Sequence, residues 1–144
     1  MQTETENVWG SARPWITADV VVIRGDRVLL IQRADEPHRG SWALPGGFVD
    51  QGEASRAAAA RELAEETGIV AMPEELTQIG TYDDPDRDPR GRVVTVAYLL
   101  EVASGVTAVA GDDAAAADWW PLSELPRLAF DHARILADAV RSLT

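Results

Sequence analysis

The chain has 144 residues, of which 46% are hydrophobic and 26% are charged, as expected for one globular domain with a substantial core. Its formal net charge of −11 argues against a nucleic-acid partner, because phosphate backbones attract basic surfaces. The lack of cysteine excludes disulfide and thiol chemistry, and a polar N-terminus with only short apolar runs favours a cytoplasmic protein without a secretory signal or a membrane span.

The first residues, 1–14, show no periodicity and are predicted to form a loose arm ahead of a single domain over 15–144. Two tryptophans, Trp9 in this arm and Trp15 directly after it, are unusual for a free tail. They are expected to pack on the domain or on a second subunit.

Strands are predicted wherever β-branched and apolar residues follow one another. In chain order these runs are Ile16–Ile23, Val28–Gln32, Trp42–Leu44, Leu76–Tyr82, Val93–Val102 and Asp118–Pro121. The first two are separated by Gly25-Asp26, which indicates a hairpin turn. The third is cut off by Pro45-Gly46-Gly47.

The remaining segments are predicted to be loops or helices. Residues 83–92 carry two prolines and a glycine and are predicted to form a charged loop, while 104–117 are rich in small residues and are expected to be irregular. A helical turn is expected at Leu122–Leu125. A last helix should begin near Asp131, a suitable N-cap.

One more helix is predicted in the middle of the chain, where an alanine run leads into Arg61–Thr67 and Gly68 ends the helix. At about 100° per residue, Glu62, Glu65 and Glu66 share one face. The opposite face is small and suited to lie against a sheet: Ala57, Ala60, Leu63, Ala64 and Thr67. Three like charges on one face repel each other, and a hard divalent cation such as Mg²⁺ would remove that cost.

Fixed intervals surround these acids. Reading onward from Gly47, Glu53 follows after five residues and Arg61-Glu62-Leu63 after seven more, and then come Glu65-Glu66 and Gly68-Ile69. A solvated acidic helix does not explain this spacing. The pattern resembles the signature of the Nudix hydrolases at every defined position, and the order of strands and helices resembles that family's α/β/α sandwich with a mixed β-sheet.

The resemblance implies roles for particular residues. Glu62, Glu65 and Glu66 match the family's metal ligands, and the carbonyl of Gly46 matches a further one. The resemblance implies that they bind Mg²⁺, or Mn²⁺ instead. Glu53 and Arg61 resemble an ion pair that ties the loop to the helix.

The catalytic base varies within the family, between a glutamate of this helix and an acid on a later loop. Asp112 and Asp113 are the candidates for such a loop acid, with plain solvation of two adjacent aspartates as the alternative.

Substrate-binding residues are expected outside the signature. Arg87, Arg90 and Arg92 offer guanidinium groups suited to phosphate, unless they pair with the aspartates of their own loop. Arg39 and Trp42 lie ahead of the signature and are candidates for facing the ligand.

The loop and its following strand resemble the ADP-ribose pyrophosphatase subgroup. The implied reaction cleaves ADP-ribose, a small-molecule nucleotide, into AMP and ribose 5-phosphate. A (deoxy)nucleoside triphosphate pyrophosphohydrolase and a non-catalytic ADP-ribose sensor are the alternatives. Related hydrolases are often dimers, so a homodimer is a further expectation.

Overall fold

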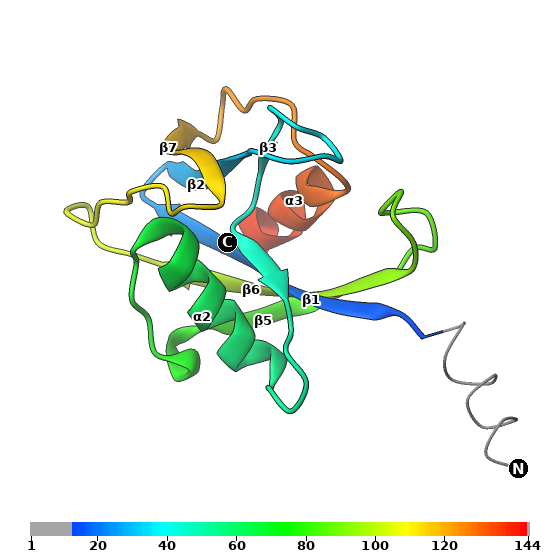
Figure 1. The fold of residues 1–144 in the computed structure, drawn as a ribbon. Helices are drawn as coiled ribbons and strands as arrows, with labels where there is room; N and C mark the ends of the chain where they lie inside the picture. The colour runs from blue at the N-terminus through cyan, green and yellow to red at the C-terminus, as the bar shows by residue number, and fades with distance from the viewer. Residues whose placement is uncertain (1–12, 144) are drawn as a thin grey trace, which may run out of the picture.

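The computed structural model describes residues 13–143, which form one seven-stranded mixed sheet with a helix on each side (Figure 1). The predicted N-terminal arm, including Trp9, lies outside these residues except for Arg13 and Pro14. The strands are β1 (Trp15–Arg24), β2 (Arg27–Arg33), β3 (Trp42–Ala43), β4 (Gly46–Phe48), β5 (Thr77–Tyr82), β6 (Val93–Glu101) and β7 (Ala114–Pro121). The helices are α2 (Ser55–Thr67), a 3₁₀ turn η1 (Pro73–Glu75) and α3 (His132–Ser142).

Strand β1 is the centre of the sheet because it has three different neighbours. It runs parallel to β6 from Trp15 to Ile23, whereas it pairs with β2 only at the hairpin end, around Ile23 and Arg24. Near its start, Thr17 to Asp19 pair with β4 instead. Strands β1 and β2 therefore diverge away from the hairpin, and β4 follows β1 while β2 pairs with β7 and β3.

The sheet is buried on both faces, and the alternation of side chains along β1 shows how. Val20 and Val22 belong to the apolar cluster beneath α2, while Val21 and Ile23 belong to the cluster beneath α3. Successive side chains of a strand point to opposite faces, so a continuous run of valine and isoleucine serves two cores at once. The predicted α/β/α sandwich with a mixed sheet is confirmed.

Helix α2 lies close to the sheet because its buried side chains are small. Ala58, Ala59, Ala60, Leu63 and Thr67 are buried, so the buried row includes two alanines that the predicted face omitted. Gly68 ends the helix in the left-handed conformation, with φ of 76°, and its N–H donates to the carbonyl of Ala64 at 3.0 Å.

Helix α3 begins where the sequence predicts, but its first turn is used differently. Asp131 occupies the N-cap position without making a side-chain capping bond, because its carboxylate binds Arg87. Ile135, Leu136 and Ala139 then face the sheet. Asp131 is the N-cap residue, as predicted, but its side chain does not cap the helix.

Three other local predictions are wrong. Gly46–Phe48 is a strand, although glycine has low strand propensity, because its pairing with β1 decides its conformation. Strand β7 starts at Ala114 and not at Asp118, since β2 supplies a pairing partner that an alanine-rich sequence does not reveal. Leu122–Leu125 is a turn that lacks helical structure.

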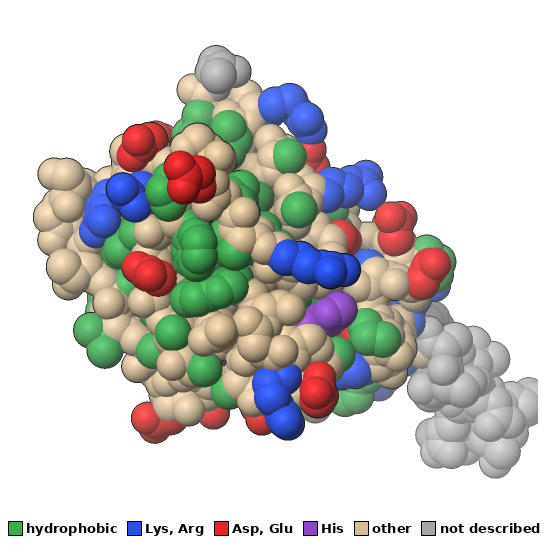
Figure 2. Space-filling model, turned by 90° about the horizontal axis from the view of Figure 1, so that it is seen from above, with side chains coloured by type: hydrophobic (Ala, Val, Ile, Leu, Met, Phe, Trp, Pro, Cys, Tyr) green, Lys and Arg blue, Asp and Glu red, His purple; other side chains and the backbone are tan. Residues whose placement is uncertain are grey.

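Within residues 13–143, no helix is both long and apolar enough to cross a bilayer. The face seen from above carries acidic and basic side chains in alternation around an apolar area (Figure 2). For the described residues on this face, positive charge is therefore not gathered into the continuous surface that a nucleic-acid backbone requires.

Candidate active site

The acidic face of α2 opens onto a cavity beside strand β4. Glu62 and Glu66 line this outer cavity, and Glu65 lies on the exposed side of the helix with 58% of its side chain accessible. The other lining residues come from β2, from β4, from the residues that follow these two strands and from the end of the loop before β7. The outer cavity is lined by Ile31, Arg33, Ala34, Asp35, Gly46, Gly47, Phe48, Asp50, Glu62, Glu66 and Asp113.

Arg61 ties the loop before α2 to the helix. Its Nε and one terminal nitrogen bind both oxygens of Glu53 at 2.9 and 3.0 Å, and the other terminal nitrogen lies 2.9 Å from Glu62 and 3.4 Å from Glu65. It also donates to the carbonyl of Phe48 at 3.1 Å. The hydrogen bond from Arg61, helped by the N–H of Asp50, lowers the pKa of Glu53 to about 2. Glu53 is thus held ionised as a partner of Arg61.

Glu66 is the most unusual acid of the site. Its Oε1 accepts the N–H of Gly46 at 2.7 Å, which joins α2 to β4. Burial raises the pKa of Glu66 to about 8, with further contributions from Glu62, Asp19 and Asp113, against the opposing effect of the Gly46 bond. Burial also raises the pKa of Glu62, although the hydrogen bond and the charge of Arg61 act to lower it. Both carboxylates would be stabilised in the charged form by a cation between them.

A hard divalent cation fits this donor set by its chemistry. Mg²⁺ and Mn²⁺ prefer carboxylate and carbonyl oxygens, and Glu62, Glu66 and the Gly46 backbone offer these around one cavity. Among residues 13–143, no three acidic or histidine side chains converge closely enough to enclose an ion, because Glu62 and Glu65 turn towards Arg61.

The two glycines of β4 allow this close approach. A Cβ on Gly47 would lie 2.5 Å from the carboxyl carbon of Glu62, and one on Gly46 would lie 2.4 Å from the carbonyl oxygen of Ala18. Real Cβ atoms do not approach other heavy atoms so closely, so the site requires glycine at both positions.

The loop acid Asp113 reaches the same cavity through the end of α2. Gly111 donates its N–H to the carbonyl of Glu66 at 2.8 Å, and a Cβ on Gly111 would lie only 2.1 Å from the carbonyl oxygen of Glu65. This contact fixes the loop two residues before Asp113, which lines the outer cavity. Asp112 does not line either of the two cavities described here.

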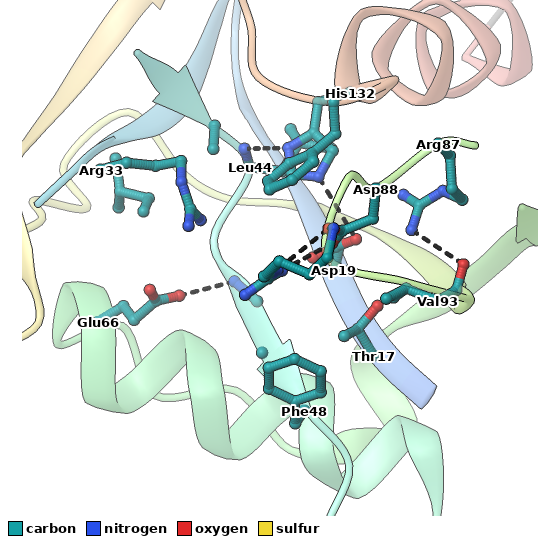
Figure 3. Close-up of a pocket in the computed structure, with 16 residues that line it drawn as sticks. Thr17, Asp19, Arg33, Leu44, Phe48, Glu66, Arg87, Asp88, Val93 and His132 are labelled. Carbon is teal, nitrogen blue, oxygen red and sulfur yellow. Dashed lines mark hydrogen bonds and ion pairs between the residues drawn. The ribbon is translucent and has the colours of Figure 1, made fainter. Parts of the chain in front are cut away.

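An inner cavity adjoins the outer one and shares Ile31, Arg33, Gly46, Gly47, Phe48 and Glu66 with it (Figure 3). Its other walls combine polar residues of β1, of the 83–92 loop and of the start of α3 with apolar residues from the ends of β3 and β6 and from the segment before α3. The residues that line only the inner cavity are Thr17, Asp19, Ala43, Leu44, Arg87, Asp88, Arg90, Val93, Phe130 and His132. One elongated ligand could extend through both cavities.

The structure separates the predicted substrate residues into three groups. Arg90 lines the inner cavity, where Asp88 holds its guanidinium by bonds of 2.7 and 3.0 Å. Arg39 and Arg92 are exposed and line neither cavity. Trp42 packs against Trp120 with ring centroids 5.2 Å apart, in the apolar cluster beneath α3.

Arg87 borders the inner cavity, but its guanidinium is already bound by another residue of the protein. Only 4% of its side chain is exposed, and two of its nitrogens bind the carboxylate of Asp131 at 2.7 and 2.9 Å. This bidentate pair joins the 83–92 loop to the first turn of α3. Arg87 thereby positions the loop that carries Asp88 and Arg90.

We expect Arg87→Ala to lower the free energy of unfolding by about 3 kcal/mol or more, because breaking one side of a buried ion pair leaves Asp131 uncompensated. Urea denaturation measures this change. Arg92→Ala, on an exposed residue of the same loop, is the control and should stay within about 0.5 kcal/mol of the wild type. A loss below about 1 kcal/mol for Arg87→Ala, typical of surface pairs, would contradict the structural role.

Sequence reasoning missed several residues of the site. Arg33 ends strand β2, donates its Nε to the carbonyl of Pro37 at 2.7 Å and lies over the ring of Phe130 at 5.0 Å. Burial and nearby Arg90 lower the pKa of Arg33, as expected for a cation directed into a confined site. A charged residue closing an apolar strand was a signal that could have been noticed. Phe48, Phe130 and Asp19 carried no such signal.

A NUDIX domain family model matches residues 13–139 of the chain. An ADP-ribose pyrophosphatase of Methanocaldococcus jannaschii is 43% identical over 128 residues, which is 89% of this chain and 74% of that protein. The ADPR responsive transcriptional repressor NtrR of Acinetobacter baylyi is 36% identical over 138 residues, or 90% of this chain and 54% of that protein. The chain thus spans only about half of the repressor.

Solved structures give the same picture. The NUDIX domain of Shewanella oneidensis NrtR, complexed with ADP ribose, has a TM-score of 0.85 at 30% identity, covering 100% of this chain and 99% of that one. A bifunctional NMN adenylyltransferase/ADP ribose pyrophosphatase of Francisella tularensis, complexed with AMP and a manganese ion, has a TM-score of 0.82 at 30% identity. That match covers 99% of this chain and 46% of the other.

Proposed function

Because this chain belongs to the Nudix family of hydrolases, we propose that it hydrolyses ADP-ribose to AMP and ribose 5-phosphate with a divalent cation. The observation that carries the proposal is the pair of half-buried acids, Glu62 and Glu66, beside the Gly46 backbone in a cavity that continues into a second one. A diphosphate with a group at each end has that elongated shape. The 43% identical ADP-ribose pyrophosphatase supports the choice of substrate.

The metal site is part of the proposal. We assign Glu62, Glu65, Glu66 and the Gly46 carbonyl to hold Mg²⁺, with Mn²⁺ as an alternative on the basis of the manganese ion in the Francisella protein. When bound, the cation supplies positive charge to the diphosphate and lowers the pKa of water. Arg61, held by Glu53, keeps the helix and β4 in register around these ligands.

The protein's own groups would then act on substrate and water. The guanidinium of Arg33 borders both cavities, so it can bind phosphate oxygens where they pass between the two. Glu66 and Asp113 border the outer cavity, and either carboxylate can accept a proton from the attacking water. Addition of that water across one P–O bond of the diphosphate gives the two monophosphates.

A substrate panel with product identification tests the reaction. We expect AMP and ribose 5-phosphate from ADP-ribose in the presence of Mg²⁺. Release of pyrophosphate from nucleoside triphosphates, with no cleavage of ADP-ribose, would favour the triphosphate pyrophosphohydrolase instead. Tight binding of ADP-ribose without turnover of any substrate would favour the sensor, the alternative suggested by the relative that is an ADPR responsive repressor.

Arg90 should contribute to substrate binding more than to the chemical step. Its guanidinium lies 5.5 Å from the ring of Phe48 and 5.6 Å from that of Phe130, and Arg90 lines the inner cavity but not the outer one. We expect Arg90→Ala to raise KM for ADP-ribose by about tenfold with little change in kcat, the pattern of lost uniform binding. Steady-state kinetics measure both. Arg92→Ala, outside both cavities, is the matched control, and equal effects of the two variants would remove Arg90 from the site.

The remaining sequence-based expectations extend the proposal without altering the site. We place the protein in the cytoplasm and expect no nucleic-acid partner. The homodimer stays a prediction, and light scattering of the purified chain would test it.

A further inference from the structure

A buried carboxylate on β1 faces the inner cavity and has no role in the hydrolysis proposed above. Asp19 is 6% exposed and is one of the residues that line that cavity (Figure 3). Its Oδ2 accepts the hydroxyl of Thr95 at 2.6 Å and lies 3.7 Å from Nε2 of His132. Its Oδ1 accepts no hydrogen bond from any residue in the described range 13–143. One oxygen of Asp19 is therefore left for a ligand.

The hydrogen bond that Nδ1 of His132 accepts determines which ring nitrogen carries the proton. Nδ1 of His132 accepts the backbone N–H of Leu44 at 3.0 Å, so the proton of the neutral ring is on Nε2, which faces Asp19. Burial lowers the pKa of His132, which keeps the ring neutral. Thr95 and His132 thus direct their donors at the same oxygen of Asp19. At Asp19 the cavity therefore presents a hydrogen-bond acceptor.

The walls of the inner cavity are flat. The rings of Phe48 and Phe130 lie 5.5 and 5.6 Å from the planar guanidinium of Arg90, which Asp88 holds in place by two hydrogen bonds. Phe130 has a left-handed backbone, with φ of 54°, a conformation that costs energy in a residue other than glycine. Its ring also contacts His38, the other left-handed residue that is not glycine in the described range, at 4.8 Å. Such aromatic and guanidinium planes favour a planar ring as ligand.

We propose that the inner cavity binds the nucleobase of the substrate and that Asp19 selects a base with an exocyclic amino group. A carboxylate only accepts hydrogen bonds, so it pairs with the amino group of adenine. Hypoxanthine has a keto oxygen at the same position. This oxygen is an acceptor, so it would face the carboxylate of Asp19 in a buried site with no hydrogen between them. The inference rests on the proposed function in one respect, because it puts the diphosphate in the outer cavity.

Binding of AMP and IMP tests this selection without any need for turnover, because the two nucleotides share the sugar and the phosphate. We expect calorimetry with Mg²⁺ to give AMP an advantage of about 10-fold to 100-fold in Kd over IMP. Asp19→Asn keeps the size of the side chain. Its carbonyl oxygen can take the place of Oδ2 and accept the hydroxyl of Thr95, which leaves the NH₂ group to face the cavity. This variant should therefore lose the preference for AMP by at least about tenfold and move towards IMP.

Thr95→Val is the matched control, because it removes a hydrogen bond from Asp19 without changing the group offered to the ligand. It should keep the ratio of the two dissociation constants. A ribose hydroxyl is also a donor, so 2′-deoxy-AMP is measured alongside. Equal affinity of the wild type for AMP and IMP, or an equal loss of both in Asp19→Asn, would overturn the proposal, as would a loss confined to removal of the 2′-hydroxyl.

The same measurements stay interpretable if an assumption fails. Absence of ADP-ribose cleavage would count against the proposed function, whereas the AMP to IMP ratio would still decide base selection. Thermal unfolding shows whether Asp19→Asn is folded. If it is not, the wild-type ratios for AMP, IMP and 2′-deoxy-AMP decide the question alone.

Discussion

Glu66→Gln is expected to lower kcat for ADP-ribose by at least about 100-fold, the loss of roughly 3 kcal/mol of transition-state stabilisation. Glutamine keeps the size of the side chain, and its carbonyl oxygen can still accept the N–H of Gly46. What disappears is the negative charge in the outer cavity. Steady-state kinetics at saturating Mg²⁺ measure the effect. Glu124→Gln, an exposed acid in a distant turn, is the control and should keep wild-type turnover.

Glu66→Gln should also change how the free energy of unfolding depends on pH. The pKa of Glu66 is raised from 4.5 to about 8 in the folded chain, mainly by burial. Folding therefore favours the protonated acid, and the stability from this group is complete below pH 4.5 and falls as pH rises towards 8. Glutamine does not titrate. In EDTA, Glu66→Gln should gain stability relative to the wild type between pH 6 and pH 9, as thermal unfolding would show.

Near-normal kcat in Glu66→Gln would contradict the metal assignment. A variant that loses activity and also unfolds would instead indicate a structural acid. The two readouts together therefore separate a ligand of the cation from a residue that only holds α2 against β4.

Gly46→Ala is the second change with a large expected effect. A Cβ at this position would lie 2.1 Å from Oδ1 of Asp19, 2.4 Å from the carbonyl oxygen of Ala18 and 2.8 Å from the Cα of Asp19. Two of these atoms are backbone, so β4 must move away from β1 and lose pairing. We expect the free energy of unfolding to fall by about 3 kcal/mol, at the upper end for overpacking, and turnover to be lost with the Gly46–Glu66 bond.

Two other glycines make this prediction specific. The three atoms nearest to an added carbon on Gly47 belong to the carboxylate of Glu62, the end of a flexible side chain, so Gly47→Ala should reduce activity more than stability. Gly105→Ala has no atom within 4 Å of the added carbon and should change neither. Urea denaturation and turnover of the three variants measure the pattern. Equal stability of Gly46→Ala and Gly105→Ala would show that β4 can move without cost.

The acidic half of the site could be predicted from sequence because its determinants are local. Glu62 and Glu66 are one helical turn apart, and a glycine stop and an arginine at fixed intervals identify the helix. The layers of the fold were predictable for a similar reason, since runs such as Val20–Ile23 indicate a strand buried on both faces.

The inner cavity could not be predicted because it is assembled from distant parts of the chain. Asp19 meets Thr95 across 76 positions, and Leu44 meets His132 across 88. No periodicity links such residues. Arg87 illustrates the same limit, because its sequence environment suggested phosphate binding, whereas Asp131, 44 positions away, binds it in the folded chain.

The buried alanines of α2, Ala58 and Ala59, limit which substitutions the enzyme can accept. Ala58 and Ala59 are wholly buried against the sheet, and this short spacing lets Glu66 reach the backbone of Gly46 at 2.7 Å. A bulkier residue at either place would lift the helix and carry its carboxylates out of reach, although it would touch no reacting group. Two small methyl groups that contact no substrate are therefore part of what holds the acids in place, and a library meant to change the activity should leave them fixed.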